Sequence, residues 1–312
     1  MNQTDRKRNT TGRYASSTPA SERVLSGLFL LAELTPRLLV IAAPTLSRLA
    51  WWGSASIRSN ILDNLARLLP TQTGLAERRR VGVGVLKHFI LFVADMGAGQ
   101  GKSVDELTAR IASAVGEANH EHARSLGRGL IIVTAHMGSF EVGMAAMVSR
   151  AKALHVVFAE DPFPRFEKMR RRLREKLGVN EARVEEGWSM WASLRDALER
   201  DEAVVVQGDR LMPGQKGAFV ELCGERVKLP SGPVRLAMMT GAPILPIYSL
   251  RQKDGRIRIV IGEPIVIDQD SGIQQPMQQL SDVLSEQLRA HPEQWLMLHR
   301  IWQGGSEESA EL

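Results

Sequence analysis

The segment that decides the fold is Gly129-Leu130-Ile131-Ile132-Val133-Thr134-Ala135-His136-Met137-Gly138-Ser139-Phe140-Glu141. Its apolar run, Gly129-Leu130-Ile131-Ile132-Val133, predicts a buried strand that ends at Thr134. A turn at Gly138 follows, and Ser139 is placed to cap a helix that begins near Phe140. Because ligands of open α/β sheets bind beyond the carboxyl ends of the strands, His136 stands where a reacting group is expected.

The rest of the chain alternates between strand and helix patterns, which predicts an α/β fold with a central, mostly parallel sheet flanked by helices. The strands are predicted at Leu130–Thr134, Val156–Ala159, Ala203–Gln207, Ala218–Leu222, Ile244–Tyr248 and Arg256–Ile261. The helices are predicted at Ile57–Leu69, Val81–Asp95, Val104–Arg124, Phe140–Ala151, Arg165–Leu177, Met190–Glu199, Ser231–Thr240 and Gln278–Ala290.

The pair His136 and Glu141 forms a His-x4-Glu pattern, which in isolation occurs in many proteins by chance. Its position at a strand end makes a chemical role more plausible. Histidine titrates near neutral pH, and a carboxylate fixes its tautomer and stabilises the imidazolium. The hypothesis is that Glu141 in the first helical turn orients His136, which takes a proton from an attacking hydroxyl.

Composition restricts the class of protein. The 312 residues include one cysteine, Cys223, so the chain has no internal disulfide and no cysteine cluster for zinc, and no metal site is expected. The net charge of +5 is concentrated in a basic N-terminal arm and in the run 165–176, which suit anionic lipids or phosphate-bearing substrates. Aromatic residues make up only 5% and are not interleaved with these runs, which argues against a nucleic-acid partner.

Four regions are predicted along the chain. Residues 1–20 form a disordered basic tail, 21–56 a membrane-associating helical segment, 57–303 the main domain and 304–312 an acidic disordered tail. The segment 21–56 is interrupted by Glu33 and Arg37, with Pro36 between them, and each apolar piece is shorter than the roughly 20 residues that cross a bilayer. It is either an interfacial or kinked anchor that ends at Trp51 and Trp52, or a helical hairpin packed on the soluble core. The adjacent basic arm favours the membrane.

Residues 97–103 (GAGQGKS) resemble a phosphate-binding P-loop, but Met96 stands where the first glycine is required. The preceding residues also read as a helix and not as a strand. A nucleotide-dependent phosphotransfer enzyme is therefore a weak alternative.

Three segments carry a resemblance to a known family, in that family's order: residues 135–141 (AHMGSFE), 229–246 (LPSGPVRLAMMTGAPILP) and 291–302 (HPEQWLMLHRIW). The chain resembles the glycerolipid and lysophospholipid acyltransferase superfamily, and most closely the bacterial late lipid A acyltransferases, from about Arg58 to Trp302. The resemblance implies O-acyl transfer at the cytoplasmic face of the inner membrane. The donor would be an acyl carrier protein thioester or acyl-CoA, with no other cofactor, and the acceptor a lipid A-type precursor or related glycolipid.

The resemblance also implies roles for individual residues. His136 and Glu141 would be catalytic, and the substrate-binding positions would be Arg171, Arg174, Asp209, Arg210, Ser231 and Gly232. Family members often have Gln where this chain has Arg210, which leaves other acceptors open, such as a phosphatidylinositol mannoside or a lysophospholipid. A non-catalytic, lipid-binding member of the fold is a further alternative. His299 and Trp302 are expected to be structural.

Overall fold

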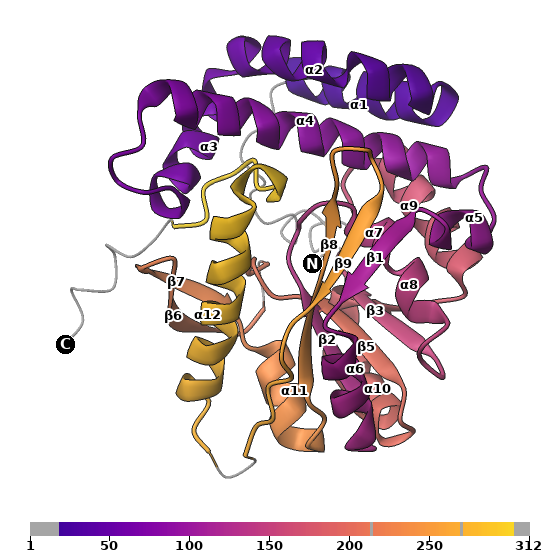
Figure 1. Ribbon diagram of the computed structural model, residues 1–312. Coiled ribbons are helices and arrows are strands. Elements are labelled where there is room, and N and C mark those ends of the chain that lie inside the picture. The colour runs from indigo at the N-terminus through magenta and orange to yellow at the C-terminus, as the bar shows by residue number, and fades with distance from the viewer. Residues whose placement is uncertain (1–18, 213–214, 269–270, 303–312) are drawn as a thin grey trace, which may run out of the picture.

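The computed structural model describes residues 19–212, 215–268 and 271–302. The tails predicted at 1–20 and 304–312 lie outside these residues, except that Pro19 and Ala20 begin the first helix. A seven-stranded sheet forms the centre of the molecule, with helices on both of its faces (Figure 1). The prediction of an α/β fold with a mostly parallel sheet is confirmed.

The strand order is β1-β9-β8-β2-β5-β3-β4, and every neighbouring pair is parallel except β8 and β9. A separate antiparallel hairpin, β6–β7, lies beside α12 (Figure 1). The strands are β1 Ile111–Val115, β2 Leu130–Thr134, β3 Leu154–Phe158, β4 Asn180–Arg183, β5 Ala203–Gln207, β6 Gly217–Leu222, β7 Glu225–Pro230, β8 Ile244–Arg251 and β9 Ile257–Ile261. The buried β2 and β5 consist mainly of β-branched residues, as central parallel strands do.

Helices cover the sheet and extend beyond its carboxyl edge (Figure 1). They are α1 Pro19–Leu34, α2 Pro36–Gly53, α3 Ala55–Leu68, α4 Leu75–Gly99, α5 Val104–Thr108, α6 Glu117–Ser125, α7 Phe140–Gly143, α8 Ala145–Val148, α9 Pro164–Leu177, α10 Trp188–Glu199, α11 Gly232–Thr240 and α12 Gln274–Ala290. Two 3-10 turns, Val184–Glu186 and Pro292–Gln294, complete the described elements.

The N-terminal helices α1 and α2 pack along α4 at the top of the molecule in Figure 1. Two glycines of α4 make this contact possible. A Cβ at Gly97 would lie 1.7 Å from the carbonyl oxygen of Ala32 in α1, and a Cβ at Gly82 would lie 2.3 Å from the ring of Trp51 in α2. The segment predicted at 21–56 therefore has one face packed on the core, while its other face is exposed.

The length and composition of α4 alone would allow it to cross a membrane, and among the described helices only α4 meets that test. Its central residues, however, are mostly buried against α1, α2 and the sheet. This pattern is typical of a core helix.

The prediction of one helix over Val104–Arg124 is wrong. The segment divides into α5, the edge strand β1 and α6. Gly116 ends the strand with φ of +87°, and a Cβ there would lie 2.1 Å from the carbonyl oxygen of Ile261 in β9. The helix predicted at Phe140–Ala151 is also interrupted, between α7 and α8, where Gly143 packs directly against Ser249. The strands β4 and β7 have no counterpart among the predictions.

The P-loop-like residues 97–103 form the end of α4 and a turn. The ammonium of Lys176 donates hydrogen bonds to the carbonyl oxygens of Gly99, Gln100 and Lys102 at 3.0, 2.7 and 2.7 Å. A P-loop instead presents backbone N–H groups to phosphate. The turn is built around a cation, and this geometry argues against a nucleotide site here.

Candidate active site

The register of two central strands brings His136 and Asp209 together. In the parallel pair β2–β5, Thr134 stands opposite Gln207. His136 and Asp209 each follow two residues later, so they leave the same edge of the sheet side by side. This is the edge at which α/β proteins bind their ligands.

Asp209 is fully buried and accepts three hydrogen bonds. Its Oδ1 lies 2.9 Å from Nδ1 of His136, and its Oδ2 accepts from the backbone N–H of His136 at 3.0 Å and from the indole N–H of Trp295 at 2.8 Å. Burial by itself raises the pKa of Asp209, but the imidazole and these donors outweigh it, so the pKa of the carboxyl lies below its usual value. An ionised Asp209 accepts from Nδ1–H and leaves Nε2 of His136 as the basic nitrogen.

The loop that carries His136 is held by the 3-10 turn Pro292–Gln294 and the residues after it. The N–H of Gly138 donates to the carbonyl of Gln294 at 3.0 Å, and the N–H of Leu296 donates to the carbonyl of His136 at 2.8 Å. The Gln294 side chain in turn forms two hydrogen bonds with the backbone of Arg251. The third family-like segment, residues 291–302, therefore supports the His136 loop.

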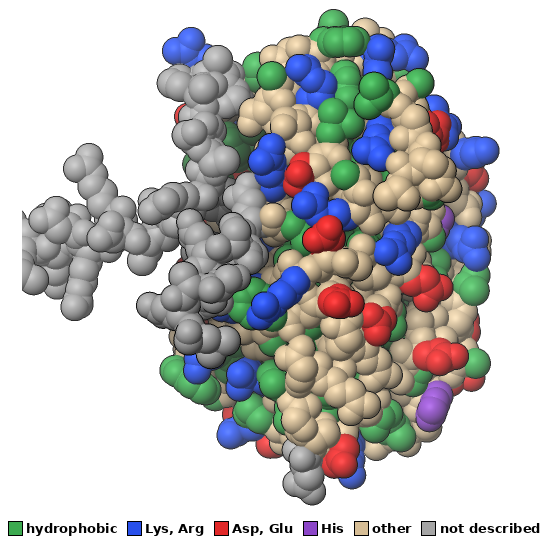
Figure 2. Space-filling view, turned by 90° about the vertical axis from the view of Figure 1, so that its left-hand side faces the viewer, with side chains coloured by type: hydrophobic (Ala, Val, Ile, Leu, Met, Phe, Trp, Pro, Cys, Tyr) green, Lys and Arg blue, Asp and Glu red, His purple; other side chains and the backbone are tan. Residues whose placement is uncertain are grey.

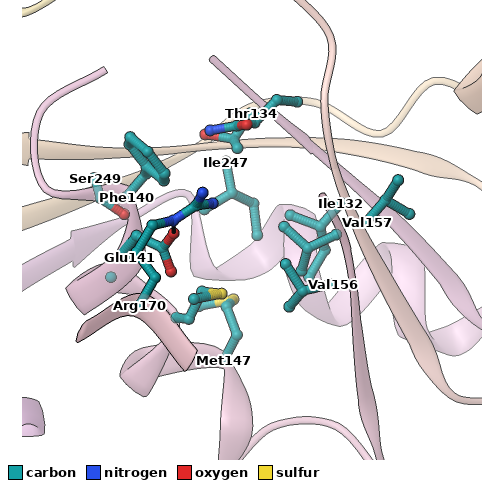
Figure 3. A pocket seen from close by; sticks show the side chains of 14 residues that line it. Ile132, Thr134, Phe140, Glu141, Met147, Val156, Val157, Arg170, Ile247 and Ser249 are labelled. Atoms are coloured by element: carbon teal, nitrogen blue, oxygen red, sulfur yellow. Dashed lines mark hydrogen bonds and ion pairs between the residues drawn. The ribbon is translucent and has the colours of Figure 1, made fainter. Parts of the chain in front are cut away.

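Glu141 lies in the first turn of α7, as predicted, but its carboxylate does not pair with His136. Glu141 is buried, and its Oε1 accepts a hydrogen bond from Nε of Arg170 in α9 at 2.7 Å (Figure 3). Burial alone lowers the pKa of Arg170, but attraction by Glu141 and Glu167 reverses the effect and raises that pKa. The carboxylate that orients the imidazole in this structure is Asp209, which corrects the predicted geometry of the pair.

The two predicted phosphate-binding arginines of α9 lie in different environments. Arg174 is fully buried and bonded to Glu167 at 2.8 Å and to Glu181 at 2.6 Å, so its guanidinium has no surface to offer a bound lipid. Arg171 is exposed and lines none of the described cavities near His136, and its role stays a prediction. Arg170 is not among the predicted site residues, because only the tertiary packing of α9 on α7 shows that it lies beside Glu141.

Ser139 holds the N-cap position of α7, but its hydroxyl makes no capping bond. It donates instead to Oδ2 of Asp95 in α4 at 2.6 Å. The same carboxylate pairs with Arg251 and with Arg110. This buried cluster ties the His136 loop to α4 and to the end of β8.

A cavity of about 220 Å³ opens beside His136, whose side chain is 28% exposed. We call it the phenylalanine cavity, because five phenylalanines line it: Phe89, Phe92, Phe140, Phe158 and Phe166. Polar groups on its wall include Gln207, Arg170 and the predicted Arg210. A much smaller apolar cavity, of about 40 Å³, lies beneath the Glu141–Arg170 pair and is lined by Ile132, Met147, Val156 and Ile247 (Figure 3).

A second large cavity, of about 490 Å³, lies next to the first and shares Val157, Val206 and Gln207 with it. We call it the tryptophan cavity, after Trp188 and Trp191. The predicted binding residues Ser231 and Gly232 line it. Gly232 must lack a side chain, because a Cβ there would lie 2.3 Å from the ring of Trp191. The structure thus places Asp209 and Arg210 near His136, and Ser231 and Gly232 in the neighbouring cavity.

His299 lies close to the same site. Burial is the main cause that lowers the pKa of His299 to about 4, and the positive charge of Arg210 adds to it. A half-buried His299 that stays neutral near pH 7 is compatible with the structural role expected for it. The indole N–H of Trp302 is buried and has no hydrogen-bond partner among the described residues.

Comparison with known proteins places this geometry in a family. The chain is 27% identical over 185 residues to a phosphatidylinositol mannoside acyltransferase of Mycolicibacterium smegmatis, which covers 58% of this chain and 59% of that protein. It is 27% identical over 210 residues to one of Mycobacterium tuberculosis, which covers 65% of this chain and 64% of that protein. The chain thus spans about three-fifths of the length of these curated relatives. The family model described as bacterial lipid A biosynthesis acyltransferase matches residues 23–304, and the chain belongs to this family.

Proposed function

We propose that this protein transfers a fatty acyl chain from a thioester donor to a hydroxyl of a glycolipid, with His136 as the general base. The observation that carries the proposal is the hydrogen bond between His136 and the buried Asp209, which leaves Nε2 as the basic nitrogen of a partly exposed side chain that lines the phenylalanine cavity. Family membership and the two mycobacterial relatives support the reaction class.

The proposed reaction has two steps. Nε2 of His136 removes the proton of the acceptor hydroxyl as its oxygen attacks the thioester carbonyl, which gives a tetrahedral oxyanion. The oxyanion then collapses, the C–S bond breaks, and the imidazolium returns the proton to the leaving thiolate. Asp209 stays ionised, holds the tautomer and stabilises the imidazolium, as the carboxylate of a catalytic triad does.

Side chains, rather than the His136 loop, are proposed to stabilise the oxyanion. The backbone N–H groups of the loop are already engaged: that of His136 by Asp209, that of Gly138 by Gln294 and that of Ser139 by the carbonyl of Ser249. Gln207 and Arg210 are polar groups on the wall of the phenylalanine cavity, where a developing negative charge would be within reach.

The acyl chain of the donor is proposed to occupy the phenylalanine cavity. Burial of each methylene contributes about 0.8 kcal/mol, so an aromatic wall of this kind gives a large driving force for a hydrocarbon chain. The donor is an acyl carrier protein thioester or acyl-CoA. Arg171, exposed on α9, is proposed to contact an anionic donor or lipid outside this cavity.

The outer face of α1 and α2 is proposed to lie on a membrane, at the cytoplasmic face of the inner membrane. Large apolar side chains are exposed along both helices: Val24, Leu31, Leu34, Leu38, Ile41, Leu49 and Trp52. Basic residues accompany them, and Figure 2 shows apolar and basic side chains together at the upper end of the molecule, where Figure 1 places these helices. A patch of this kind on a soluble surface indicates a lipid or protein partner, and the basic side chains favour anionic lipid.

A lipid A-type precursor is the first candidate acceptor, favoured by the family description. A phosphatidylinositol mannoside is the second, favoured by the two relatives.

Purified protein is to be incubated with palmitoyl-CoA or acyl carrier protein thioester and with each acceptor in detergent micelles. Mass spectrometry should show one acceptor gaining the mass of one acyl chain.

The variant His136→Gln is the matched test of mechanism, because it keeps a polar side chain at the cavity wall but removes the base. We expect transfer to be lost while the thermal unfolding profile is unchanged. Full activity of His136→Gln would contradict the mechanism, and binding of these lipids without transfer by the wild type would favour the non-catalytic alternative.

A further inference from the structure

We propose that the tryptophan cavity binds the phosphate-bearing head group of the glycolipid acceptor, through Lys216 and Arg235, with Trp188 as a stacking surface for a sugar ring. This inference rests on the proposed acyl transfer and assigns one of its two substrates to one of the two cavities.

The charge of the two cavities differs. Of the described residues that line the tryptophan cavity, Lys216 and Arg235 are cationic and none is acidic. Neither cation forms an ion pair with another described residue. The phenylalanine cavity carries Glu160 and Asp161 as well as its arginines, and Arg170 there is already neutralised by Glu141. An anionic head group is therefore attracted to the tryptophan cavity.

One buried hydroxyl links the side chain of Arg235 to the backbone of Lys216. Ser231 is fully buried, and its Oγ donates to the backbone carbonyl of Lys216 at 3.1 Å. The same Oγ accepts from Nε of Arg235 at 3.1 Å. Because this contact uses Nε, the two terminal nitrogens of the Arg235 guanidinium can donate to a ligand. Guanidinium groups are well suited to bind phosphate. Ser231 thus brings the backbone of Lys216, just before β6, and the side chain of Arg235 in α11 to one rim.

Trp188 completes this rim. Its side chain is 80% exposed although it is a large apolar residue, and the ammonium of Lys216 lies 5.9 Å from the centre of its ring. An exposed aromatic ring beside a cation offers a flat apolar face for the C–H groups of a sugar and a charge for its phosphate. Trp191, which also lines the cavity, packs with its ring against Gly232.

The position of the cavity fits the acceptor. Val157, Val206 and Gln207 line both cavities, so a ligand in the tryptophan cavity lies next to the space into which His136 projects. The acyl chain of the donor fills the aromatic phenylalanine cavity, and the acceptor hydroxyl approaches from the neighbouring cavity. The deeper apolar residues Leu236 and Met238 then face the lipid part of the acceptor.

The test uses the full chain and steady-state kinetics with each substrate varied separately, with a phosphatidylinositol mannoside and a lipid A precursor as acceptor probes. Lys216→Gln and Arg235→Gln should each raise the KM for the acceptor about tenfold, since a hydrogen bond to a charged group contributes about 1.5–3 kcal/mol. The KM for the donor and kcat should change less than about twofold, within the error expected for exposed substitutions. Lys228→Gln, on the β6–β7 hairpin that follows Lys216 but outside the cavity, is the matched control and should behave as the wild type.

Substitutions of Trp188 give a second, independent test of the acceptor assignment. Trp188→Ala should raise the acceptor KM, and Trp188→Phe should restore it, because stacking needs only an aromatic face. An increase in the donor KM in the lysine and arginine variants would overturn the assignment and place the donor phosphates in this cavity. Unchanged values for both substrates would overturn it as well.

A binding measurement separates this inference from the proposed function. Vesicles of phosphatidylcholine that contain the acceptor probe are compared with vesicles of equal charge that contain phosphatidylglycerol. The wild type should prefer the acceptor vesicles, and the double variant Lys216→Gln/Arg235→Gln should lose that preference even if no acyl transfer occurs. An absence of preference in the wild type would refute the inference, whereas an absence of transfer with the preference intact would refute only the proposed function.

Discussion

The indole N–H of Trp295 donates to Oδ2 of Asp209 at 2.8 Å, while Oδ1 of the same carboxylate lies 2.9 Å from the imidazole of His136. The carboxylate is thus fixed from two sides, by the loop it orients and by the segment that supports this loop. Single substitutions of Asp209 and Trp295 can therefore test the two contacts separately.

Asp209→Asn should lower kcat by a factor of about 10²–10⁴, because an amide cannot both hold Nδ1–H and stabilise the imidazolium. Steady-state kinetics and the pH dependence of kcat/KM measure the effect. Asp209→Glu, which keeps the charge but lengthens the side chain, should recover part of the rate. A wild-type rate for Asp209→Asn would show that this carboxylate has no part in proton transfer.

Trp295→Phe keeps the ring and removes the indole donor. With one hydrogen bond fewer, the Asp209 carboxylate becomes a stronger acceptor, so the acidic limb of the kcat/KM profile should move to higher pH and kcat should fall about tenfold. Trp302→Phe is the control, because its indole N–H is buried without a described partner. That change should leave the profile unchanged and the stability equal or higher. The same shift in both variants would indicate a general packing effect.

Glu141→Gln should reduce stability more than it alters the pH profile. It removes the closest anionic partner of Arg170, whose remaining carboxylate neighbours are Glu167, at 3.7 Å, and Asp161. Loss of one partner of a buried pair costs about 3–5 kcal/mol, which urea denaturation would detect. The double variant Glu141→Gln/Arg170→Met should be more stable than Glu141→Gln alone. A shifted pH profile at unchanged stability would restore Glu141 as the orienting group of His136.

His299 should make folding stability depend on pH between about 4 and 6.5. Its pKa is lowered to about 4 in the folded protein, so the unfolded chain binds more protons in this range. Stability therefore rises with pH from about 4 to 6.5 and is lost as the pH falls, on the order of 3 kcal/mol in all. Thermal melts of the wild type and of His299→Gln across this range measure the effect. Parallel curves for the two proteins would contradict it.

Ile41→Glu should weaken membrane binding without loss of fold. Ile41 is 75% exposed on α2, and transfer of such a side chain into lipid contributes about 1.5–3 kcal/mol. Flotation with anionic vesicles should show at least tenfold weaker binding. Val115→Glu, an exposed apolar position on the edge strand β1, is the matched control. Equal binding of both variants would argue that the face of α1 and α2 does not contact lipid.

Local sequence patterns predict the strands that carry the site, because β2 and β5 are buried and densely β-branched. The ends of these strands place His136 and Asp209 at one edge. Strand order is not a local property, however, and it is the adjacency of β2 and β5 that makes Asp209 the partner of His136. The edge strand β1 is short and partly exposed, so its local pattern is also compatible with a helix. Its pairing with β9, which is distant in sequence, makes it a strand.

The charged residues of α9 show a second limit of prediction from local sequence patterns. The run 165–176 reads as a solvated basic face, yet Phe166, Met169, Leu173 and Leu177 form a buried stripe. Arg170 and Arg174 lie beside this stripe and are drawn inside by Glu141, Glu167 and Glu181. Their counter-ions come partly from other elements, so helical periodicity alone could not identify which arginines remain exposed.

The contacts that α4 makes with α1 and with the His136 loop affect which acceptor lipid can react. Asp95 of α4 holds the His136 loop through Ser139, and two residues later Gly97 receives the backbone of α1. The proposed membrane-facing helix α1 and the loop that carries His136 therefore both pack on α4. In the proposed orientation, these two contacts on α4 set the distance of the active site from the bilayer. An acceptor is then selected by how far its hydroxyl projects from the lipid surface, in addition to the chemistry of its head group.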